Sequence, residues 1–263
     1  MLTFLKLGGS LITDKSREAT FRADVMARLA DEIAAACAAH PDRQLLIGHG
    51  SGSFGHYPAA LYHTVEGVWT GEQWRGFAEV GAVAAQLNRL VTDALRAAGL
   101  PVLSLQPSAS ARCEDGQLVE MALEPIRGAL AHGLIPLVYG DVCLDDVRGG
   151  TIASTEAILL YLARHLRPGR VLLAGLDAGV LDTTGEVIPR IDAASLSTLG
   201  DALGGRAGVD VTGGMRSKVM DMLDLARTLP RAEIRIFSGA VPGAVRRALA
   251  DAHFTEGTVI LHS

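Results

Sequence analysis

Residues 2–10, LTFLKLGGS, begin with a run of mainly apolar residues and end in two glycines and a serine. The run from Leu2 to Leu7 has the length and composition of a buried β-strand. Similar short apolar runs alternate along the chain with amphipathic helical segments. This alternation is typical of a largely parallel sheet that helices cover on both faces. The sequence therefore predicts an α/β fold, a three-layer αβα sandwich with a mainly parallel central sheet.

The expected elements follow from periodicity and from glycine and proline punctuation. We predict strands at residues 2–7, 44–47, 101–105, 135–139, 170–174, 233–237 and 258–261. We predict helices at residues 22–39, 72–98, 154–166 and 215–229, with a last one from near residue 242. Residues 142–152 carry paired aspartates and glycines, which favour a hairpin added antiparallel at the sheet edge. Ser154 is the expected N-cap of its helix.

Composition limits the classes of protein to which the chain can belong. Its 263 residues are 49% hydrophobic but only 5% aromatic, which predicts an aliphatic core. The net charge is −5 and no long run of like charge occurs, so a nucleic-acid-binding surface is not expected. We expect one domain with two lobes divided near residue 166. The most glycine-rich stretch, residues 200–214, is the best candidate for a flexible element.

Cysteine usage and hydropathy bear on the compartment. The three cysteines, Cys37, Cys113 and Cys143, are far apart and form no CxxC pair, so we expect free thiols in a reducing compartment. The N-terminus lacks the long apolar centre of a signal peptide, and no apolar run approaches the ~18 residues of a spanning helix. We therefore expect a cytoplasmic protein without a membrane partner.

The first glycine-rich turn, residues 8–10, directly follows the first strand. Glycines there let the backbone approach a ligand closely, and their N–H groups can surround phosphate oxygens. Lys6 and Gly8 share a strand face, which directs the ammonium toward the same place. The alternative is a tight turn beside a solvated lysine.

Two further glycine-rich turns have the character of anion sites. The second, residues 49–56 (HGSGSFGH), combines glycine amides with two hydroxyls and two histidines, although either histidine could be structural. The third, Gly213 and Gly214, comes just before the predicted start of a helix, and Lys218 falls one turn into it. Phosphate binds well at helix N-termini, and an anion there would compensate the lysine charge. An ordinary glycine linker is the alternative for the third turn.

Several well-known motifs are missing from the sequence. None of the turns has Walker A spacing, and none is GxGxxG followed by a ribose-binding acid. A GxSxG elbow and a zinc-ligand spacing are also missing, and we assign no metal ligand in the chain. A hydrolase or dehydrogenase is therefore poorly supported.

Taken in order, the turns resemble those of the amino acid kinase superfamily and, within it, the isopentenyl phosphate kinase family. The motifs that carry the resemblance are KLGGSLITDK (6–15), HGSGSFGH (49–56), IPLVYGDV (135–142) and VTGGMRSK (211–218). The closing histidine of the second motif marks the branch whose acceptor is a phosphate or phosphonate. The resemblance implies a single amino acid kinase domain over residues 1–263. Its acceptor-binding lobe would span about residues 1–165 and its nucleotide-binding lobe about 166–263.

The resemblance also implies roles for individual residues, with ATP and Mg²⁺ as cofactors. The residues expected to bind ATP are Lys6, Gly8, Gly9, Ser10, Gly52, Asp177, Gly179, Gly214 and Lys218. Those expected to bind the acceptor are Ser51, Gly52, His56, Gly140 and Thr155. Those expected to act in catalysis are Lys6, Lys15, His56, Glu156 and Lys218. A homodimer is expected on the same ground.

One segment departs from the family pattern. Where the family commonly has Ser-Gly-Asp, this chain has Ser154, Thr155 and Glu156. The acid is expected to orient the catalytic lysines, and Glu156 keeps the charge on a side chain one methylene longer. Thr155 replaces a glycine that approaches the acceptor. The change leaves the reaction type in place and bears on the pose of the acceptor.

The expected acceptor is a small phosphate with a short isoprenoid tail, namely isopentenyl phosphate. The segment from Val65 to Leu90 follows the second turn in sequence and suits a pocket for that tail. It contains the apolar residues Val68, Trp69, Trp74, Phe77, Val80 and Val83, which include both tryptophans of the chain. A core-facing helix stripe is the alternative for this segment. Other acceptors left open are a phosphonate of the fosfomycin type and another small alkyl monophosphate. A non-catalytic nucleotide-binding regulator is the alternative of a different class.

Overall fold

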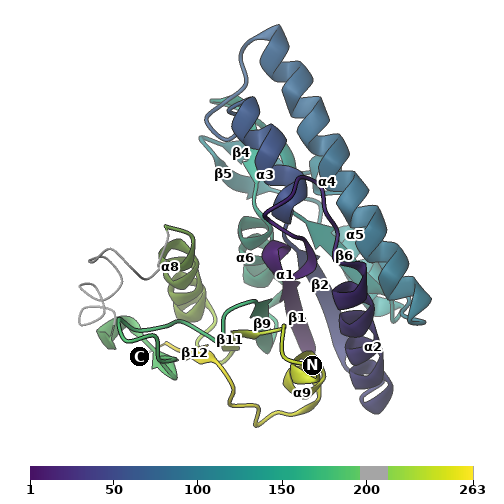
Figure 1. Ribbon diagram of the computed structural model, residues 1–263, viewed down its shortest axis with the longest axis vertical. Helices are drawn as coiled ribbons and strands as arrows, with labels where there is room; N and C mark the ends of the chain where they lie inside the picture. Colours follow the sequence, from purple (N-terminus) through teal and green to yellow (C-terminus); the bar gives the residue numbers. More distant parts are fainter. Residues whose placement is uncertain (196–212, 263) are drawn as a thin grey trace.

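The computed structural model describes residues 1–195 and 213–262, except for the side chains of residues 56–58 and 213–214. Most of the glycine-rich stretch 200–214, the candidate flexible element, lies outside the described residues. Within them, no helix is both long enough and apolar enough to cross a membrane. Figure 1 shows the course of the chain, with helices on both sides of a central sheet.

Eight strands in the described part of the chain form the central sheet, in the order β10-β12-β11-β9-β1-β2-β6-β3. They are β1 (Leu2–Leu7), β2 (Gln44–His49), β3 (Val102–Ser104), β6 (Ile135–Tyr139), β9 (Arg170–Gly175), β10 (Arg190–Ile191), β11 (Glu233–Ser238) and β12 (Thr258–Ile260). Neighbouring strands are parallel except for the antiparallel pair β11 and β12. The predicted mainly parallel sheet is confirmed, with strand bounds within two residues of those expected.

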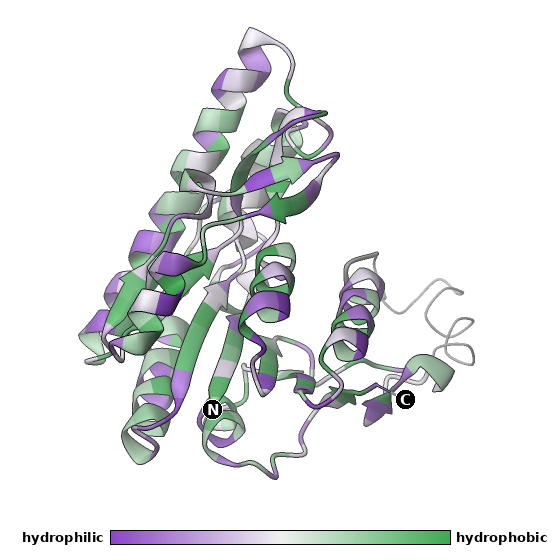
Figure 2. Ribbon diagram, turned by 180° about the vertical axis from the view of Figure 1, so that it is seen from behind, coloured by the Kyte–Doolittle hydropathy of each residue, from purple (hydrophilic) through white to green (hydrophobic). Residues whose placement is uncertain are grey.

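The longer helices form the two outer layers. One face carries α2 (Ala23–Ala39), α4 (Gly71–Ala97) and α9 (Ala244–Ala250), which contact one another through α2. The other face carries α5 (Glu124–Ala131), α6 (Thr155–Leu166) and α8 (Gly213–Thr228). Apolar side chains fill both interfaces, and Figure 2 shows the strands between the layers as mainly hydrophobic. The arrangement is the predicted three-layer αβα sandwich.

Strand β1 shows how side-chain alternation supplies both interfaces. Successive side chains of a strand point to opposite faces. Leu5 and Leu7 lie in the core toward α2 and α9, whereas Phe4 lies in the core toward α6 and α8. Lys6 follows Phe4 by two residues and therefore points to the α6 side, at the carboxyl end of the strand.

Four further strands within the described ranges form a second, smaller sheet, in the order β5-β4-β7-β8. They are β4 (Arg112–Glu114), β5 (Gln117–Glu120), β7 (Asp141–Asp145) and β8 (Gly149–Ala153). The predicted hairpin exists as β7 and β8, but its expected place at the edge of the central sheet is wrong. The segment between β3 and α5 supplies β4, which pairs with β7, and β5, which pairs with β4; a local pattern does not reveal this pairing.

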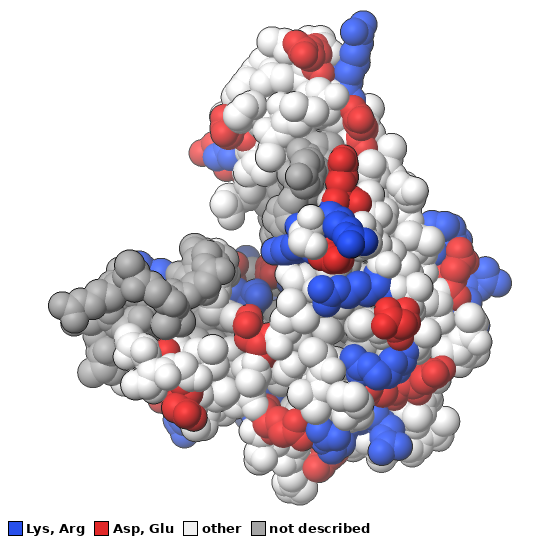
Figure 3. Space-filling view, in the orientation of Figure 1, with Lys and Arg blue, Asp and Glu red and all other residues white. Residues whose placement is uncertain are grey.

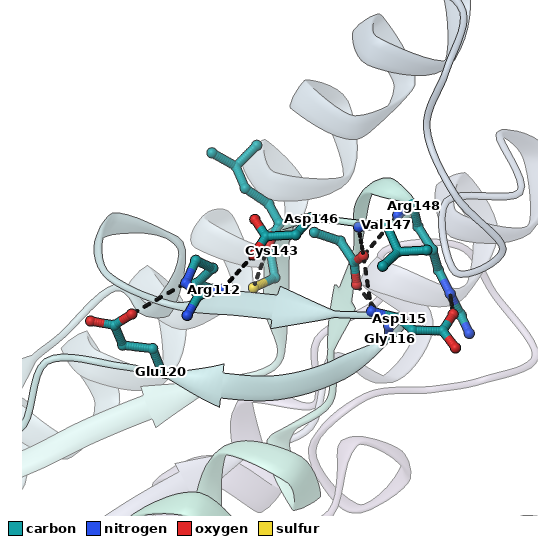
Figure 4. Close-up of polar contacts among 10 residues, drawn as sticks. Arg112, Asp115, Gly116, Glu120, Cys143, Asp146, Val147 and Arg148 are labelled. Atoms are coloured by element: carbon teal, nitrogen blue, oxygen red, sulfur yellow. Dashed lines mark hydrogen bonds and ion pairs between the residues drawn. The ribbon is translucent and has the colours of Figure 1, made fainter.

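Asp145 joins the two turns of this small sheet. Its carboxylate accepts hydrogen bonds from the backbone N–H groups of Asp115, Gly116, Val147 and Arg148, at 2.7 to 3.1 Å. These bonds hold the pKa of Asp145 below its usual value against the opposing effect of desolvation. Figure 4 shows the two turns side by side, with ion pairs of Arg112 along the same sheet.

Short helices follow the strands at the carboxyl edge of the central sheet. They are α1 (Gly9–Ile12) after β1 and α3 (Gly52–Leu61) after β2, and a 3₁₀ turn, η1 (Pro107–Ala109), follows β3. Ser154 caps α6, as predicted, by accepting a hydrogen bond from Ala157 N at 3.1 Å. The first and second glycine-rich turns thus lie where parallel strands end, the usual place for a ligand in such sheets.

Candidate active site

A cavity of about 620 Å³ opens at the carboxyl edge of the central sheet, where β1, β2, β6 and β9 end. Figure 3 shows the surface hollowed between the part that carries α8 and the part that carries α3, with charged side chains at the margin. The expected site residues that line this cavity are Lys6, Gly8, Gly9, Ser10, Lys15, Ser51, Gly52, Gly140, Thr155, Glu156, Asp177, Gly179 and Lys218.

Lys6 and Glu156 meet at the base of the cavity. Alternation along β1 turns Lys6 toward α6, and Glu156 lies in the first turn of that helix. Their side chains form an ion pair, in which the Lys6 side chain is 7% exposed. Burial would raise the pKa of Glu156, but the charge and hydrogen bond of Lys6, with the charge of Lys218, lower it below its usual value. Glu156 is therefore held ionised beside two ammonium groups.

Lys218 approaches the same point from the first turns of α8. Burial lowers the pKa of Lys218, and the charges of Lys6 and Lys15 lower it further, while Glu156 and Asp177 partly offset the effect. Like charges gathered in a partly buried site raise the free energy of the charged forms. A bound polyanion would reverse this cost, so the lysines are arranged for an anionic ligand.

Four helix N-termini also meet at the cavity. Lining residues belong to the first turns of α1, α3, α6 and α8. The first N–H groups of a helix have no intrahelical acceptor, and the helix dipole makes that end partially positive. Together with three ammonium groups, these helix ends make the cavity a strong anion site.

The first and second glycine-rich turns pack directly against each other. A Cβ atom added at Gly9 would lie 2.7 Å from Gly52 Cα, and one added at Gly50 would lie 2.8 Å from Gly9 N. Gly52 also has a φ of +51°, in the left-handed region that favours glycine. Side chains at these positions would force the turns apart. The glycines therefore bring two amide-lined segments into contact within one cavity.

One expected acceptor residue, Thr155, and one histidine of the second turn, His49, have their side chains engaged by the protein. Thr155 is 2% exposed, and its hydroxyl donates to His49 O at 2.7 Å. His49 itself is buried, stacks on Tyr139, and has its pKa lowered to about 4 by desolvation. His49 is therefore a neutral structural histidine, one of the alternatives that the sequence left open.

Two expected residues are not described as lining the cavity. Gly214 is the second residue of α8, at the helix end that faces the cavity. His56 lies in α3, four residues after Gly52, and its side chain is outside the described part of the chain. The roles of both remain predictions.

One end of the cavity is apolar. Its wall there includes Val65, Val80, Ala84 and Ile152, from the α3–α4 connection, α4 and β8. Neither tryptophan is among the described lining residues, and Trp69 is 62% exposed. Val65, Val80 and Ala84 belong to the expected tail-pocket segment 65–90 and line the cavity, whereas the two tryptophans of that segment do not. Trp69 lies just before α4 and Trp74 in the first turn of α4. The binding of the tail by this segment stays a prediction.

Sequence reasoning missed Asp141 and the segment 175–176 among the lining residues. Asp141 begins β7 and accepts hydrogen bonds from Ser108 N at 3.1 Å and Val142 N at 2.9 Å. Burial raises the pKa of Asp141, and these bonds lower it in part. Asp141 follows the end of β6 by two residues, and this position was a signal that could have identified it. Gly175 ends β9 and Leu176 follows it, which was a similar positional signal.

Comparisons with known proteins agree with this geometry. The model of the amino acid kinase family matches residues 1–238. The chain is 37% identical to isopentenyl phosphate kinase of Methanothermobacter thermautotrophicus, over 94% of this chain and 95% of that protein. It is also 37% identical to isopentenyl phosphate kinase of Haloferax volcanii, over 94% of this chain and 98% of that protein. A solved structure of isopentenyl phosphate kinase, 32% identical, superposes with a TM-score of 0.84 and covers 99% of this chain and 100% of that one.

Proposed function

Because the chain belongs to the amino acid kinase family, we propose that it transfers the γ-phosphate of ATP to isopentenyl phosphate, forming isopentenyl diphosphate and ADP. The observation that carries this proposal is the convergence of Lys6, Lys15 and Lys218 on one cavity with an apolar end. The cationic part suits two phosphate-bearing reactants, and the apolar end suits a short isoprenoid tail. The relatives named isopentenyl phosphate kinase support the same acceptor.

The main obstacle to this reaction is repulsion between two anions. A phosphate monoester has a second pKa of about 6, so its attacking oxygen is largely ionised at neutral pH and no general base is required. Phosphoryl transfer then depends on alignment and on charge neutralisation. Fixed ammonium groups and helix N-termini supply both without reorganising during the reaction.

We assign the nucleotide phosphates to the part of the cavity between the first glycine-rich turn and α8. The amides of residues 8–10, with Lys6, would hold the β- and γ-phosphates, and Lys218 with Gly214 would contact them from α8. Asp177 and Gly179, after β9, would contact the adenosine. Glu156 would orient Lys6 through their ion pair. Residues 166–263 would then form most of the nucleotide lobe.

We assign the acceptor phosphate to the second glycine-rich turn, in the lobe of about residues 1–165. Amides of Ser51 and Gly52 at the start of α3 would bind its oxygens, with His56 as a further donor. Gly140 leaves room beside Thr155, where a Cβ would lie 3.1 Å from Thr155 Oγ1. Lys15 would stabilise the phosphoryl group in transfer. The tail would lie against Val80 and Ala84.

Mg²⁺ would reach the site on the nucleotide and would neutralise phosphate charge there. Within the described residues no cluster of three His, Cys, Asp or Glu side chains could hold a metal alone. Mg²⁺ typically keeps several waters and binds through phosphates and one or two carboxylates. We further propose a cytoplasmic location, in keeping with three free cysteines, and a homodimer, on the ground of the family resemblance alone.

An ADP-release assay across a panel of acceptors tests the assignment. The panel contains isopentenyl phosphate, dimethylallyl phosphate, fosfomycin and short alkyl phosphates. We expect the highest kcat/KM with isopentenyl phosphate. Faster turnover of fosfomycin would transfer the assignment to a phosphonate kinase, and ATP binding without turnover of any acceptor would favour the non-catalytic regulator.

A histidine variant tests the acceptor half of the site. His56→Ala should raise the KM for isopentenyl phosphate at least tenfold, because a charged or neutral donor to a phosphate is lost. The affinity for ATP should be unchanged. His63→Ala, a change of an exposed histidine just after α3, is the matched control. Equal acceptor constants for His56→Ala and the parent would remove His56 from the site.

A further inference from the structure

Thr13 lies between the two glycine-rich turns and is fully buried. Its hydroxyl donates to Gly9 O at 2.8 Å and accepts a hydrogen bond from Ser53 N at 2.9 Å. One oxygen therefore joins the turn after β1 to the first turn of α3. Because the hydroxyl uses its single proton on Gly9, it can serve Ser53 only as an acceptor.

The loop that carries Lys15 is attached to the same point. Thr13 and Phe21 form an isolated β-bridge, and Asp14 N donates to Thr20 O at 2.9 Å, so the loop closes on itself. Its returning strand then contacts Ser53, whose hydroxyl accepts from Thr20 N at 3.2 Å. Lys15 therefore lies in a loop whose two sides, at Thr13 and at Thr20, both hydrogen-bond to Ser53.

We propose that Thr13 is a positioning residue for phosphoryl transfer, which fixes the separation between the ATP-binding turn and the acceptor-binding turn. The proposal rests on the proposed function, because it takes the two turns to hold the two reactants. Rates of such reactions depend steeply on the distance between the reacting groups, and an error of about 1 Å can cost 10²-fold. Ser53 completes the arrangement by tying in the loop of Lys15.

Removal of a hydroxyl that only stabilises the fold should leave kcat unchanged. Thr92 supplies the comparison inside the same chain: it is buried, and its hydroxyl also donates to the carbonyl four residues earlier, Asn88 O, at 2.7 Å. Thr92 lies within α4 and joins no two segments of the cavity. Thr13→Val and Thr92→Val therefore remove the same chemical group with different consequences for the site.

The experiment compares Thr13→Val, Thr13→Ser and Thr92→Val for kcat, for the Kd of ATP alone and for thermal unfolding. Thr13→Val should lower kcat at least tenfold while the Kd of ATP changes less than threefold, and Thr13→Ser should recover most of the rate. Thr92→Val should keep the parent kcat. An unchanged kcat in Thr13→Val, or equal losses in Thr13→Val and Thr13→Ser, would overturn the proposal.

If Thr13→Val does not fold, a second variant and a second readout still test the proposal. Ser53→Ala frees Thr20 N but leaves the Thr13 bonds in place, and it should lower kcat about threefold with unchanged ATP affinity; a parent kcat would overturn the role of the loop. In the parent, a non-hydrolysable ATP analogue should slow amide exchange in residues 50–55, and Thr13→Val or Ser53→Ala should weaken this protection. Analogue protection with no acceptor turnover in the parent would contradict the proposed function alone.

Discussion

Two carboxylates near helix N-termini, one buried and one partly buried, show how differently this chain uses the same chemical group. Glu32, on α2, accepts hydrogen bonds from the backbone N–H groups of Gly243, Val245 and Arg246 at the start of α9, at 2.8 to 3.3 Å, and it pairs with Arg28. Glu156, in the first turn of α6, pairs with Lys6 and faces the cavity. We refer to these regions as the α2–α9 seam and the cavity edge.

The difference lies in what satisfies each charge. At the seam, the partners of Glu32 are mostly backbone dipoles that cannot move without unfolding α9. At the cavity edge, the partners of Glu156 are the ammonium groups of Lys6 and Lys218, which outnumber it and face the cavity where phosphates would bind. The seam therefore contributes mainly to stability and the cavity edge mainly to binding and catalysis. Substitutions in each region should separate the two properties.

The largest expected effect is a loss of activity in Lys218→Met. Removal of one preorganised cation that faces the transferred phosphates should lower kcat by about 10²–10³-fold. The pKa of Lys218 is lowered in the ligand-free protein, mainly by burial and then by Lys6. The charged form therefore destabilises the fold, and the variant should unfold at the same temperature as the parent or higher. Steady-state kinetics and calorimetry measure the two quantities.

Arg216→Met is the matched control for that change. Arg216 precedes Lys218 by two residues on α8 and is exposed. The Arg216→Met variant should keep the parent kcat. A comparable loss in both variants would mean that α8 as a whole, and not the Lys218 ammonium, accounts for the activity.

Glu32→Gln should show the opposite pattern at the seam. An amide can accept through only one oxygen, so at least one buried N–H of α9 loses a charged acceptor, at a cost of about 3 kcal/mol. Urea unfolding should report that loss, while kcat of the folded fraction stays at the parent value. A fall in kcat without a fall in stability would join the seam to the active site and break the comparison.

Glu156→Gln should have a smaller and mixed effect. Lys6 loses its orienting partner, so kcat should fall about tenfold through misplacement of the ammonium, whereas ATP binding should be retained because a repelling charge is gone. The folded pKa of Glu156 lies below its unfolded value of 4.5. Its contribution to stability is therefore complete above that pH and is lost as the pH falls through the folded pKa.

Unfolding measured from pH 7 down to pH 3 checks this sign. The stability advantage of the parent over Glu156→Gln should shrink below about pH 4.5. An advantage that stays constant across this range would mean that the ionised carboxylate contributes nothing to the ligand-free fold.

The smallest expected effect is that of Arg28→Met. Arg28 pairs with Glu32 and donates to Gly239 O at 2.8 Å, but its side chain is partly exposed. The backbone N–H groups still satisfy Glu32 in the variant, so the free energy of unfolding should fall by only about 1 kcal/mol. A loss as large as that of Glu32→Gln would show that the ion pair, and not the backbone dipoles, stabilises the seam.

The sequence predicted the central sheet well because strands buried on both faces are continuous apolar runs with clear ends. It also predicted the positions of Lys6 and Gly8, since both follow from the alternation of β1. It placed the β7–β8 hairpin in the wrong sheet, because pairing with β4 is a contact across about thirty residues. It identified segment 65–90 beside the site but not which of its side chains face the cavity, because composition does not say which way a side chain points; Val65 and Val80 line the cavity and Trp69 does not.

The sequence by itself determined the layer order, the three glycine-rich turns and the charged residues beside them, because each depends on local spacing. Only the tertiary structure decided that Lys6, Lys15 and Lys218 share one cavity, and that Thr13 joins the first two turns through a single oxygen. These are contacts between segments distant in the chain. They form only because parallel strands end at a common edge, where the turns that follow them must pack together.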